Sequence, residues 1–275
     1  NATFQQGVTV DQGELRVDGT LTGSSIEIGQ NGNISGNGTI VSNLLSRGQI
    51  SPGQSPGLLT INGDMTLAAG SQTNIEIDGL IAQDGAGGFD RISVIGVNRA
   101  VAVGGTLAPV LRGITGAANN NFTPKLGDSV RFLDVANGTI TGSFAGLTQP
   151  GSGLAAGTRF DVVYGTGSLL LAATPLSYAD LSGHGIRQSA AAVSIGRAID
   201  ASRPLAGIRP SDALQPLYSS LYLANAEGLA HGLEQASGVI YIGSGQATVM
   251  SLGRFADEIW SHQGELARTD LSSMD

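Results

Sequence analysis

Short segments in which apolar and polar residues alternate run through residues 1–177. Val8-Thr9-Val10, Ser25-Ile26-Glu27-Ile28 and Asn74-Ile75-Glu76-Ile77 are examples, and glycine, asparagine, serine and aspartate separate one segment from the next. A period of two residues sends successive side chains to opposite faces of a strand. The segments therefore predict half-buried β-strands of about three to five residues, shorter than the usual strand.

The segments share a frame in which a glycine begins and ends an alternating run. Gly13-Glu14-Leu15-Arg16-Val17-Asp18-Gly19 and Gly57-Leu58-Leu59-Thr60-Ile61-Asn62-Gly63 both show it. A unit repeated about every 20 residues is typical of a β-solenoid, in which each turn buries its inward residues against its neighbours. Because parallel crossovers are nearly always right-handed, the sequence predicts a mainly β fold, a right-handed parallel β-helix. The inward stacks should include Ile26/Ile28, Leu59/Ile61, Ile75/Ile77 and Val101/Val103.

Two Ser-Pro-Gly units, Ser51-Pro52-Gly53 and Ser55-Pro56-Gly57, mark a corner of this predicted solenoid. Proline fixes φ near −65° and glycine accepts a positive φ, so each unit suits a tight type II-like turn. Neither a helix nor a central strand tolerates that spacing. The corner should lie between half-buried strands.

Aromatic residues become more frequent after residue 130. Phe132, Phe144 and Phe160 lie in the alternating runs between 130 and 177. A solenoid must seal its last turn, and large aromatic side chains would do so. We expect an aromatic C-terminal cap built of hairpins over 130–177.

From residue 178 onward the pattern becomes helical. Ala192, Ile195 and Ile199 share one helix face, and so do Leu229 and Leu233. Ser211 is a predicted N-cap for a helix that carries Leu214, Leu217 and Leu221, and a further face holds Val249, Leu252, Ala256 and Ile259. We expect the segment 178–275 to be rich in helix, to lack a large core of its own, and to pack on the solenoid, on a second copy or inside a barrel pore.

Composition excludes several classes of function. The net charge is −8, and Lys125 is the single lysine, so no basic stretch could neutralise a phosphate backbone and no nucleic-acid partner is expected. The absence of cysteine excludes disulfides, cysteine-bound metal and a thiol nucleophile. No run of about 18 apolar residues is present. The chain begins at Asn1 without a methionine or a signal peptide, which predicts that it is a fragment.

Three patterns resemble chemical sites, and for each the structural interpretation is stronger. Residues 53–57 match the G-x-S-x-G nucleophile elbow, but β pattern follows where a helix is required, and His184, His231 and His262 all lie in the helical segment. Residues 85–90 differ at Ala86 from a calcium-binding G-G-x-G-x-D unit, which works only in tandem copies.

The acidic residues on the strands are the third pattern. Glu27, Glu76 and Asp78 each follow an inward apolar residue, which indicates a solvated outer face rather than a glycosidase pair. Parallel β-helix lyases and pectinases do place acids on one outer face, so this alternative stays open. We predict no catalytic, cofactor-binding or metal site.

Several of these segments, in this order, resemble the C-terminal passenger region of bacterial autotransporters (type V secretion). They are GNGTI, the two Ser-Pro-Gly units, LLTINGDMTL, DRISV with VAVGGTL, and RFLDVANGTITGSF. LEQASGVIYIGSGQATVMSLGRFADEIW is similar to the linker before the outer-membrane barrel, with Val239 in place of the usual glutamate. The resemblance implies a β-helix passenger stem over 1–129, a capping or autochaperone region over 130–177, and a helical linker over 178–275.

The resemblance also implies a function. The chain would be a non-enzymatic part of an adhesin or virulence factor on the bacterial cell surface or secreted from it, whose C-terminal turns nucleate folding. Its partners would be its own C-terminal barrel, absent from this chain, and host-surface, matrix or self ligands. The alternative is the stem of an autotransporter with an upstream protease, lipase or polysaccharide-active domain. A third class is a stand-alone polysaccharide-binding β-helix.

Overall fold

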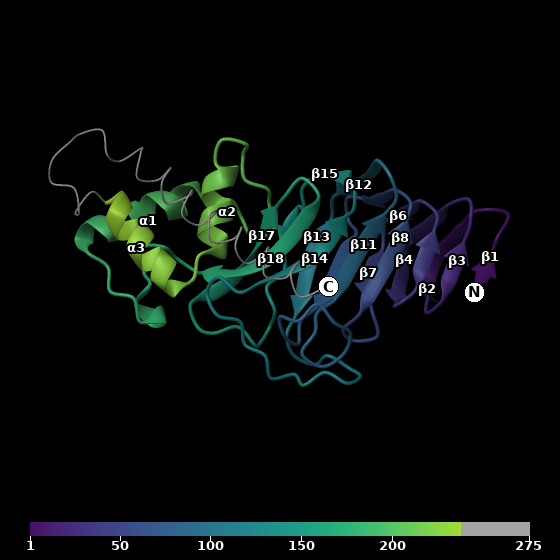
Figure 1. The fold of residues 1–275 in the computed structure, drawn as a ribbon, viewed down its shortest axis with the longest axis horizontal. Coiled ribbons are helices and arrows are strands. Elements are labelled where there is room, and N and C mark those ends of the chain that lie inside the picture. Colours follow the sequence, from purple (N-terminus) through teal and green to yellow (C-terminus); the bar gives the residue numbers. More distant parts are fainter. Residues whose placement is uncertain (238–275) are drawn as a thin grey trace, which may run out of the picture.

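A computed structural model describes residues 1–237. The chain forms two sheets followed by helices, with the N-terminus at one end and the helices at the other (Figure 1). None of the helices in this range is both long and apolar enough to span a membrane. The fold is mainly β, as predicted.

The first sheet has eight strands, which follow one another along the molecule (Figure 1). Its pairs are parallel from the N-terminal end as far as Ser129–Val135, and the last two strands are antiparallel. In spatial order the strands are β1 (Ala2–Thr3), β3 (Thr20–Thr22), β5 (Thr39–Val41), β8 (Leu58–Asn62), β11 (Arg91–Ile95), β14 (Ser129–Val135), β18 (Ser168–Pro175) and β17 (Thr158–Tyr164).

The second sheet has ten strands, all in parallel pairs, and bends at one long strand. In β4, residues Ile26 to Ile28 pair with one neighbour, and Asn33 to Gly36 pair with another. One arm runs from β4 (Ile26–Gly36) through β6 (Leu44–Ser46), β9 (Met65–Leu67) and β12 (Arg99–Val103) to β15 (Gly138–Gly142). The other runs through β7 (Gln49–Pro52), β10 (Gln72–Glu76) and β13 (Thr106–Val110) to β16 (Gly146–Leu147), and β2 (Val8–Arg16) pairs along β4.

Register keeps equivalent residues of successive turns in line. Thr20 pairs with Thr39, and Thr39 pairs in turn with Thr60, which matches the spacing of the repeat in the sequence. Ile40 pairs with Ile61, and Ile61 with Val94. All three side chains of this second row are fully buried, so the pairing of the backbones also stacks the core.

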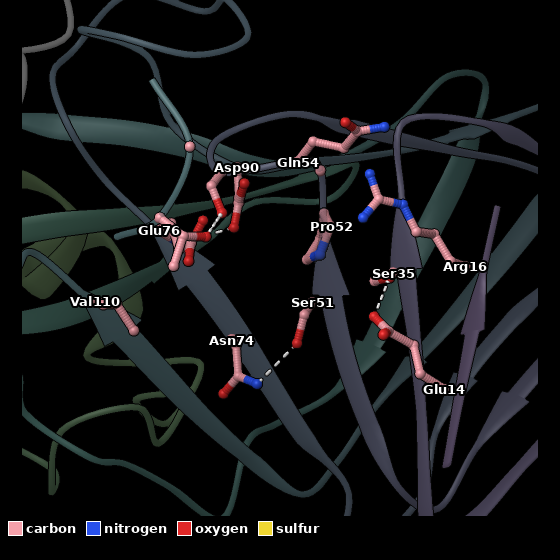
Figure 2. Close-up of a pocket in the computed structure, with 14 residues that line it drawn as sticks. Glu14, Arg16, Ser35, Ser51, Pro52, Gln54, Asn74, Glu76, Asp90 and Val110 are labelled. Atoms are coloured by element: carbon pink, nitrogen blue, oxygen red, sulfur yellow. Dashed lines mark hydrogen bonds between the residues drawn. The ribbon is translucent and has the colours of Figure 1, made fainter. Parts of the chain in front are cut away.

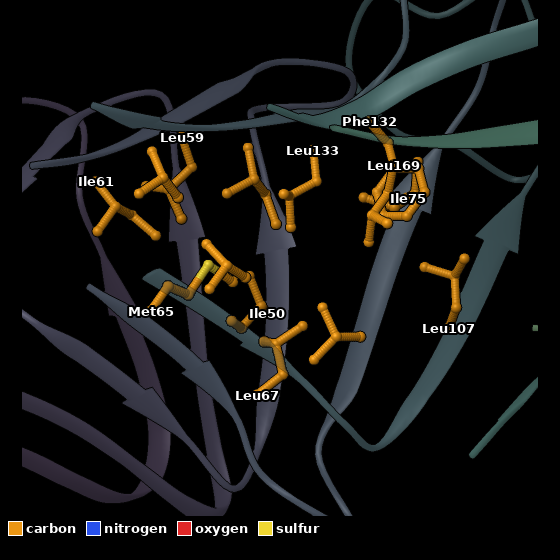
Figure 3. Packing of buried hydrophobic residues seen from close by; sticks show 14 of the residues in the cluster. Ile50, Leu59, Ile61, Met65, Leu67, Ile75, Leu107, Phe132, Leu133 and Leu169 are labelled. Atoms are coloured by element: carbon orange, nitrogen blue, oxygen red, sulfur yellow. The ribbon is translucent and has the colours of Figure 1, made fainter. Parts of the chain in front are cut away.

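The core lies between the two sheets and runs along the molecule. Strand after strand shows alternating buried and half-buried positions, as in β8 and β11. Figure 3 shows side chains from both sheets meeting in this layer, among them Ile50, Leu59, Met65 and Leu107. All the predicted inward pairs are buried: Ile26/Ile28, Leu59/Ile61, Ile75/Ile77 and Val101/Val103.

Connections lengthen at one corner of the turns and stay short elsewhere. The links from the arm that contains β7 to the first sheet span residues 37–38, 53–57, 77–90 and 111–128 in successive turns. The links on the other corners stay within a few residues, such as 63–64 and 104–105. The later turns therefore use more chain than the early ones without losing register.

The Ser-Pro-Gly corner differs from its prediction at Pro52. We predicted that this spacing is incompatible with a central strand, but Pro52 ends β7 and is paired with Gly36 of β4. The N–H of Gly53 donates to the Gly36 carbonyl, 2.9 Å away, so the hydrogen bond between the strands is made one residue later. The turn itself is residues 53–57, with Gly53 at φ 90° and a cis Ser55-Pro56 bond.

Large aromatic side chains fill the C-terminal end of the core. Phe132, Phe144, Phe160 and Tyr164 are all buried there, and β17 and β18 form the antiparallel hairpin at this end of the sheet. Reversal of strand direction ends the series of parallel turns. The aromatic residues lie where the sequence pattern places them, whereas the three-part division at 129 and 177 stays a prediction.

The helical segment packs on the outside of the hairpin and shares a buried cluster with it, which is one of the arrangements predicted for a segment without a large core of its own. It consists of a short 3-10 turn (Ser182–His184), α1 (Ala190–Ser202), α2 (Gln215–Leu223) and α3 (Ala226–Ala236). A second buried cluster joins Val163 and Ala172 of the hairpin to the helical side chains. Its other members include Tyr178, Leu181, Ala192, Ile199, Tyr218, Leu221, Tyr222, Leu229 and Leu233. The three tyrosines fill much of this cluster, and they were not part of the helix faces predicted from leucine, isoleucine and alanine.

The start of α2 corrects another prediction. Ser211 is not an N-cap, because the helix begins at Gln215 and the Ser211 carbonyl instead accepts hydrogen bonds from Leu214 and Gln215. A start at Ser211 would have placed Pro216 where a backbone N–H is needed. Pro216 lies in the first turn of the observed helix. The face predicted from Val249 to Ile259 lies outside the described residues.

A buried ion pair joins the hairpin to the helices. The Asp161 carboxylate on β17 accepts hydrogen bonds from Arg203, from Thr174 and from Arg159. The Arg203 side chain is 3% exposed and that of Asp161 2%. Arg203 also lies over the rings of Tyr178 and Tyr222, 4.8 and 5.3 Å from their centroids. Burial disfavours its charge, but the Asp161 carboxylate, Tyr178 and Tyr222 together outweigh this and raise the pKa of Arg203.

Replacement of Arg203 by methionine should destabilise the chain by about 3–5 kcal/mol, because it leaves the Asp161 carboxylate buried with fewer partners. Urea unfolding followed by circular dichroism measures the change. The matched control is Arg197→Met, at an exposed position of α1, which should alter the free energy of unfolding by less than about 0.5 kcal/mol. Equal losses in the two variants would contradict a structural role for the ion pair.

Candidate functional site

A polar groove of about 620 Å³ lies at the Ser-Pro-Gly corner. We call it the corner groove, and its lining includes Glu14, Arg16, Gln54, Asn74, Glu76 and Thr115. These residues come from β2, β10 and two of the corner loops. Figure 2 shows strands side by side beneath the groove, with their polar side chains directed toward it.

Strand register builds the floor of the groove. Arg16 pairs with Ser35, and Ser35 pairs with Ser51, so three outward positions of β2, β4 and β7 form one row. Asn74 on β10 extends the row, because its Nδ2 donates to Ser51 Oγ at 3.0 Å. Ser35 Oγ donates to the Glu14 carboxylate. The inward residues of the same strands are apolar except for Thr73 on β10, so the core fixes this polar face from below.

Two corner loops form the rim. The hydroxyls of Ser55 and Thr115 lie 2.9 Å apart, which links the loop 53–57 to the loop 111–128. Gly53 and Gly57 pack directly on each other: a Cβ on Gly57 would lie 2.6 Å from the Gly53 Cα. A side chain at either position would push the turn open.

Two carboxyl groups lie side by side at the inner end of the groove (Figure 2). Asp90 is 1% exposed, and its oxygens accept hydrogen bonds from the N–H groups of Gly57 and Glu76, at 2.8 and 2.9 Å. Burial raises the pKa of Asp90 to about 8; the backbone N–H of Glu76 works against this shift, and the nearby Glu76 carboxylate adds to it. Burial also raises the pKa of Glu76, and the Ser55 hydroxyl opposes the shift.

The nucleophile-elbow pattern at 53–57 does not have the geometry of an elbow. The turn connects β7 to β8, so a strand follows it and not a helix. Ser55 lies against Thr115. In the described part of the chain, His184 Nε2 contacts the Gly157 carbonyl and His231 lies 3.9 Å from Glu227, so neither approaches Ser55. His262 lies outside the described residues.

The Asp78 carboxylate holds the glycine-rich loop at 85–90 in place. The Asp78 carboxylate accepts hydrogen bonds from the N–H groups of Gly87, Asn119 and Asn120, at 2.8, 2.8 and 2.6 Å. It therefore fastens two successive corner loops together. Among residues 1–237 there is no group of three or more histidine, aspartate or glutamate side chains that could hold a metal ion.

The predicted solvated outer face describes only some of the acidic residues. Glu27 is exposed and pairs with Arg47, but the prediction is wrong for Asp78, which is 3% exposed. Asp78 lies just beyond β10, where the chain leaves the sheet, so strict alternation no longer applies. Sequence reasoning also missed Asp90, which belongs to the groove. Its position between a glycine-rich loop and the apolar run of β11 was the available signal.

No protein-family model matches the chain. A comparison with curated proteins finds similarity to an extracellular serine protease of Serratia marcescens, with 31% identity over 146 residues. The match covers 52% of this chain and 13% of that protein. The chain is thus similar to a small part of a protein named for an extracellular location, and it spans far less than the whole length of that protein.

The Asp90 carboxyl should make stability depend on pH. Its pKa is about 8 in the folded chain against an ordinary 3.8, so the folded state holds the proton more tightly. The stabilisation is complete below about pH 4 and is lost as the pH rises toward 8; Glu76 adds in the same direction. We expect the free energy of unfolding, measured with urea, to fall between pH 5 and pH 9.

Asp90→Asn should lower stability at pH 5 by about 1–3 kcal/mol, because one backbone N–H loses its acceptor, and should reduce the fall between pH 5 and pH 9. Asp212→Asn, at an exposed position, is the control and should keep the wild-type pH profile. If the free energy of unfolding of Asp90→Asn falls between pH 5 and pH 9 by as much as that of the wild type, groups other than Asp90 cause the pH dependence.

Proposed function

We propose that the chain is the stem and folding cap of a surface-displayed or secreted protein of the autotransporter type, and that it is not itself an enzyme. In this proposal, the two parallel sheets form a right-handed β-helix, and the turns at the C-terminal end fold first. The observation that carries the proposal is the aromatic hairpin cap on a series of in-register parallel turns.

The parallel turns support the stem. Each strand in the series pairs with the equivalent strand of the next turn, as β5 does with β3 and β8. Contacts of this kind reach only the nearest neighbours, so folding can begin at one turn and propagate along the series. A structure of this type serves as an extended support and needs no catalytic groups.

The cap supports a starting point at the C-terminal end. The hairpin is local in sequence and pairs along its whole length, from Thr158 with Pro175 to Tyr164 with Leu169. The Tyr164 hydroxyl donates to the Gly207 carbonyl at 2.6 Å and accepts from the Phe144 N–H at 2.9 Å, which fixes it to the segment after α1 and to the last turn. β14 then pairs with β18, which offers the preceding turn a finished template.

The alternative is that the same stem belongs to a larger enzyme. The similarity to an extracellular serine protease favours this version over an adhesin. The described residues do not place a histidine beside Ser55, so the catalytic groups would lie in another part of such a protein. The full reading frame decides between the two: a Ser-His-Asp domain before Asn1 favours the enzyme, and further copies of the glycine frame favour the adhesin.

Removal of residues 130–171 should abolish refolding from urea, or surface display in a secretion assay, whereas removal of 1–36 should leave a chain that still folds. The reason is that only the first deletion removes the proposed nucleus. Recovery of the β signal in circular dichroism measures the difference. Equal effects of the two deletions would overturn the proposed folding order.

Two core substitutions give a finer test. Leu169 in the hairpin and Ile28 in an early turn are both fully buried, so alanine at either should cost about 2–5 kcal/mol. Stopped-flow kinetics should show that Leu169→Ala slows refolding, while Ile28→Ala mainly speeds unfolding. The reverse distribution would place the nucleus at the N-terminal end.

A fluorophosphonate probe that labels activated serines should leave this chain unlabelled, with trypsin as the positive control. The Ser55 hydroxyl lies against Thr115 and the Glu76 carboxylate, and no histidine among residues 1–237 lies beside it to activate it. Labelling that disappears in Ser55→Ala would contradict the non-enzymatic assignment for this chain.

A further inference from the structure

The corner groove has the size and the preformed shape of a ligand site. Its volume of about 620 Å³ falls within the range of about 300–1,000 Å³ that small-molecule sites occupy. The floor is a sheet backed by the core, and the rim is held by the contacts of Ser55 with Thr115 and of Asp90 with Gly57. A ligand would find the groove formed, without having to order a loop.

The lining excludes several kinds of ligand. Among residues 1–237, Pro52 and Val110 are the only apolar side chains that line the groove, so an apolar molecule would leave many polar groups without water or partners. A phosphate or carboxylate ligand would face Glu14 and Glu76. Arg16 could not offset this fully, because it already pairs with Asp18 at 2.8 Å.

A strongly cationic ligand is also disfavoured. Burial raises the pKa of both Asp90 and Glu76. The inner end of the groove therefore carries less negative charge at neutral pH than two ordinary carboxyl groups would. What remains is a surface of carboxyl, amide and hydroxyl groups, which together both donate and accept hydrogen bonds.

We propose that the corner groove binds a neutral, hydroxyl-rich oligosaccharide through Glu14, Gln54 and Glu76. Gln54 uses its amide nitrogen on Asp18, which leaves its carbonyl oxygen to accept from a sugar hydroxyl. Glu14 and Glu76 lie on β2 and β10, at two sides of the groove. Neighbouring strands are about 4.8 Å apart, so polar groups recur across the floor and suit a ligand whose hydroxyls also recur.

The binding should depend on hydrogen bonds alone, because none of the described residues that line the groove is aromatic. Affinity will be modest and specific to the three named side chains. This site is independent of the proposed stem and folding cap: a stem without a sugar site would still fold and cap in the same way.

Titration calorimetry and saturation-transfer NMR on the whole chain test the proposal. The probes are three neutral hexasaccharides (cellohexaose, maltohexaose and laminarihexaose), with hexagalacturonate as the anionic comparison and a lysine hexapeptide as the cationic one. We expect at least one neutral hexasaccharide to bind and both charged probes to fail. Glu76→Gln and Gln54→Ala should each weaken binding about tenfold, the effect of one lost hydrogen bond to a charged or well-placed group.

Matched controls separate the groove from the rest of the surface. Glu227→Gln changes an exposed glutamate of α3, and Thr66→Ala an exposed residue of β9 on another face; both should bind as the wild type does. Thermal unfolding checks that every variant is folded. If Glu76→Gln does not fold, Gln54→Ala alone tests the groove. Three outcomes would overturn the proposal. In the first, none of the three neutral sugars binds; in the second, only the lysine peptide binds, in a salt-sensitive way. In the third, a sugar binds but neither groove variant weakens its binding.

Discussion

Parallel pairing between one turn and the next is the interaction on which the rest of the molecule depends. It satisfies the backbone groups of very short strands, which would not be stable alone, and it places Ile40, Ile61 and Val94 in one row of the core. The same register sets the outward row of Arg16, Ser35 and Ser51. The core and the polar floor of the corner groove therefore have one cause.

A series of parallel turns needs an end, and the hairpin of β17 and β18 provides it. Its inner face completes the aromatic end of the core, while Val163 and Ala172 on its outer face belong to the second cluster. Asp161 and Arg203 then fasten the helices to this outer face. The hairpin thus has one role in the sheets and another in the helical segment, which explains why its residues are buried on both sides.

The period of the sequence predicted the strands and the inward rows, because alternation is a local property, and the phenylalanines after residue 130 are buried in the core. The period did not predict Asp78 or Asp90 as buried, since Asp78 lies just after β10 and Asp90 just before β11, where alternation does not apply. The groove was not predictable either. It depends on Ser55 and Thr115, which are far apart in sequence and meet only because two turns stack. The tyrosines of the second cluster were not predicted, because Tyr178 lies in a turn after β18 and Tyr218 and Tyr222 lie in a helix of modest apolar pattern.

The links at a single corner lengthen from 37–38 to 111–128. The chain can therefore grow longer at this corner while the paired strands keep their arrangement. New residues can enter there without any change in the strands, and Asp78 shows how a long loop is fastened to the next one. A scaffold of this kind can acquire a recognition surface by insertion while its axial repeat stays the same. The corner is accordingly the position at which a foreign peptide could be inserted with the least change to the strands.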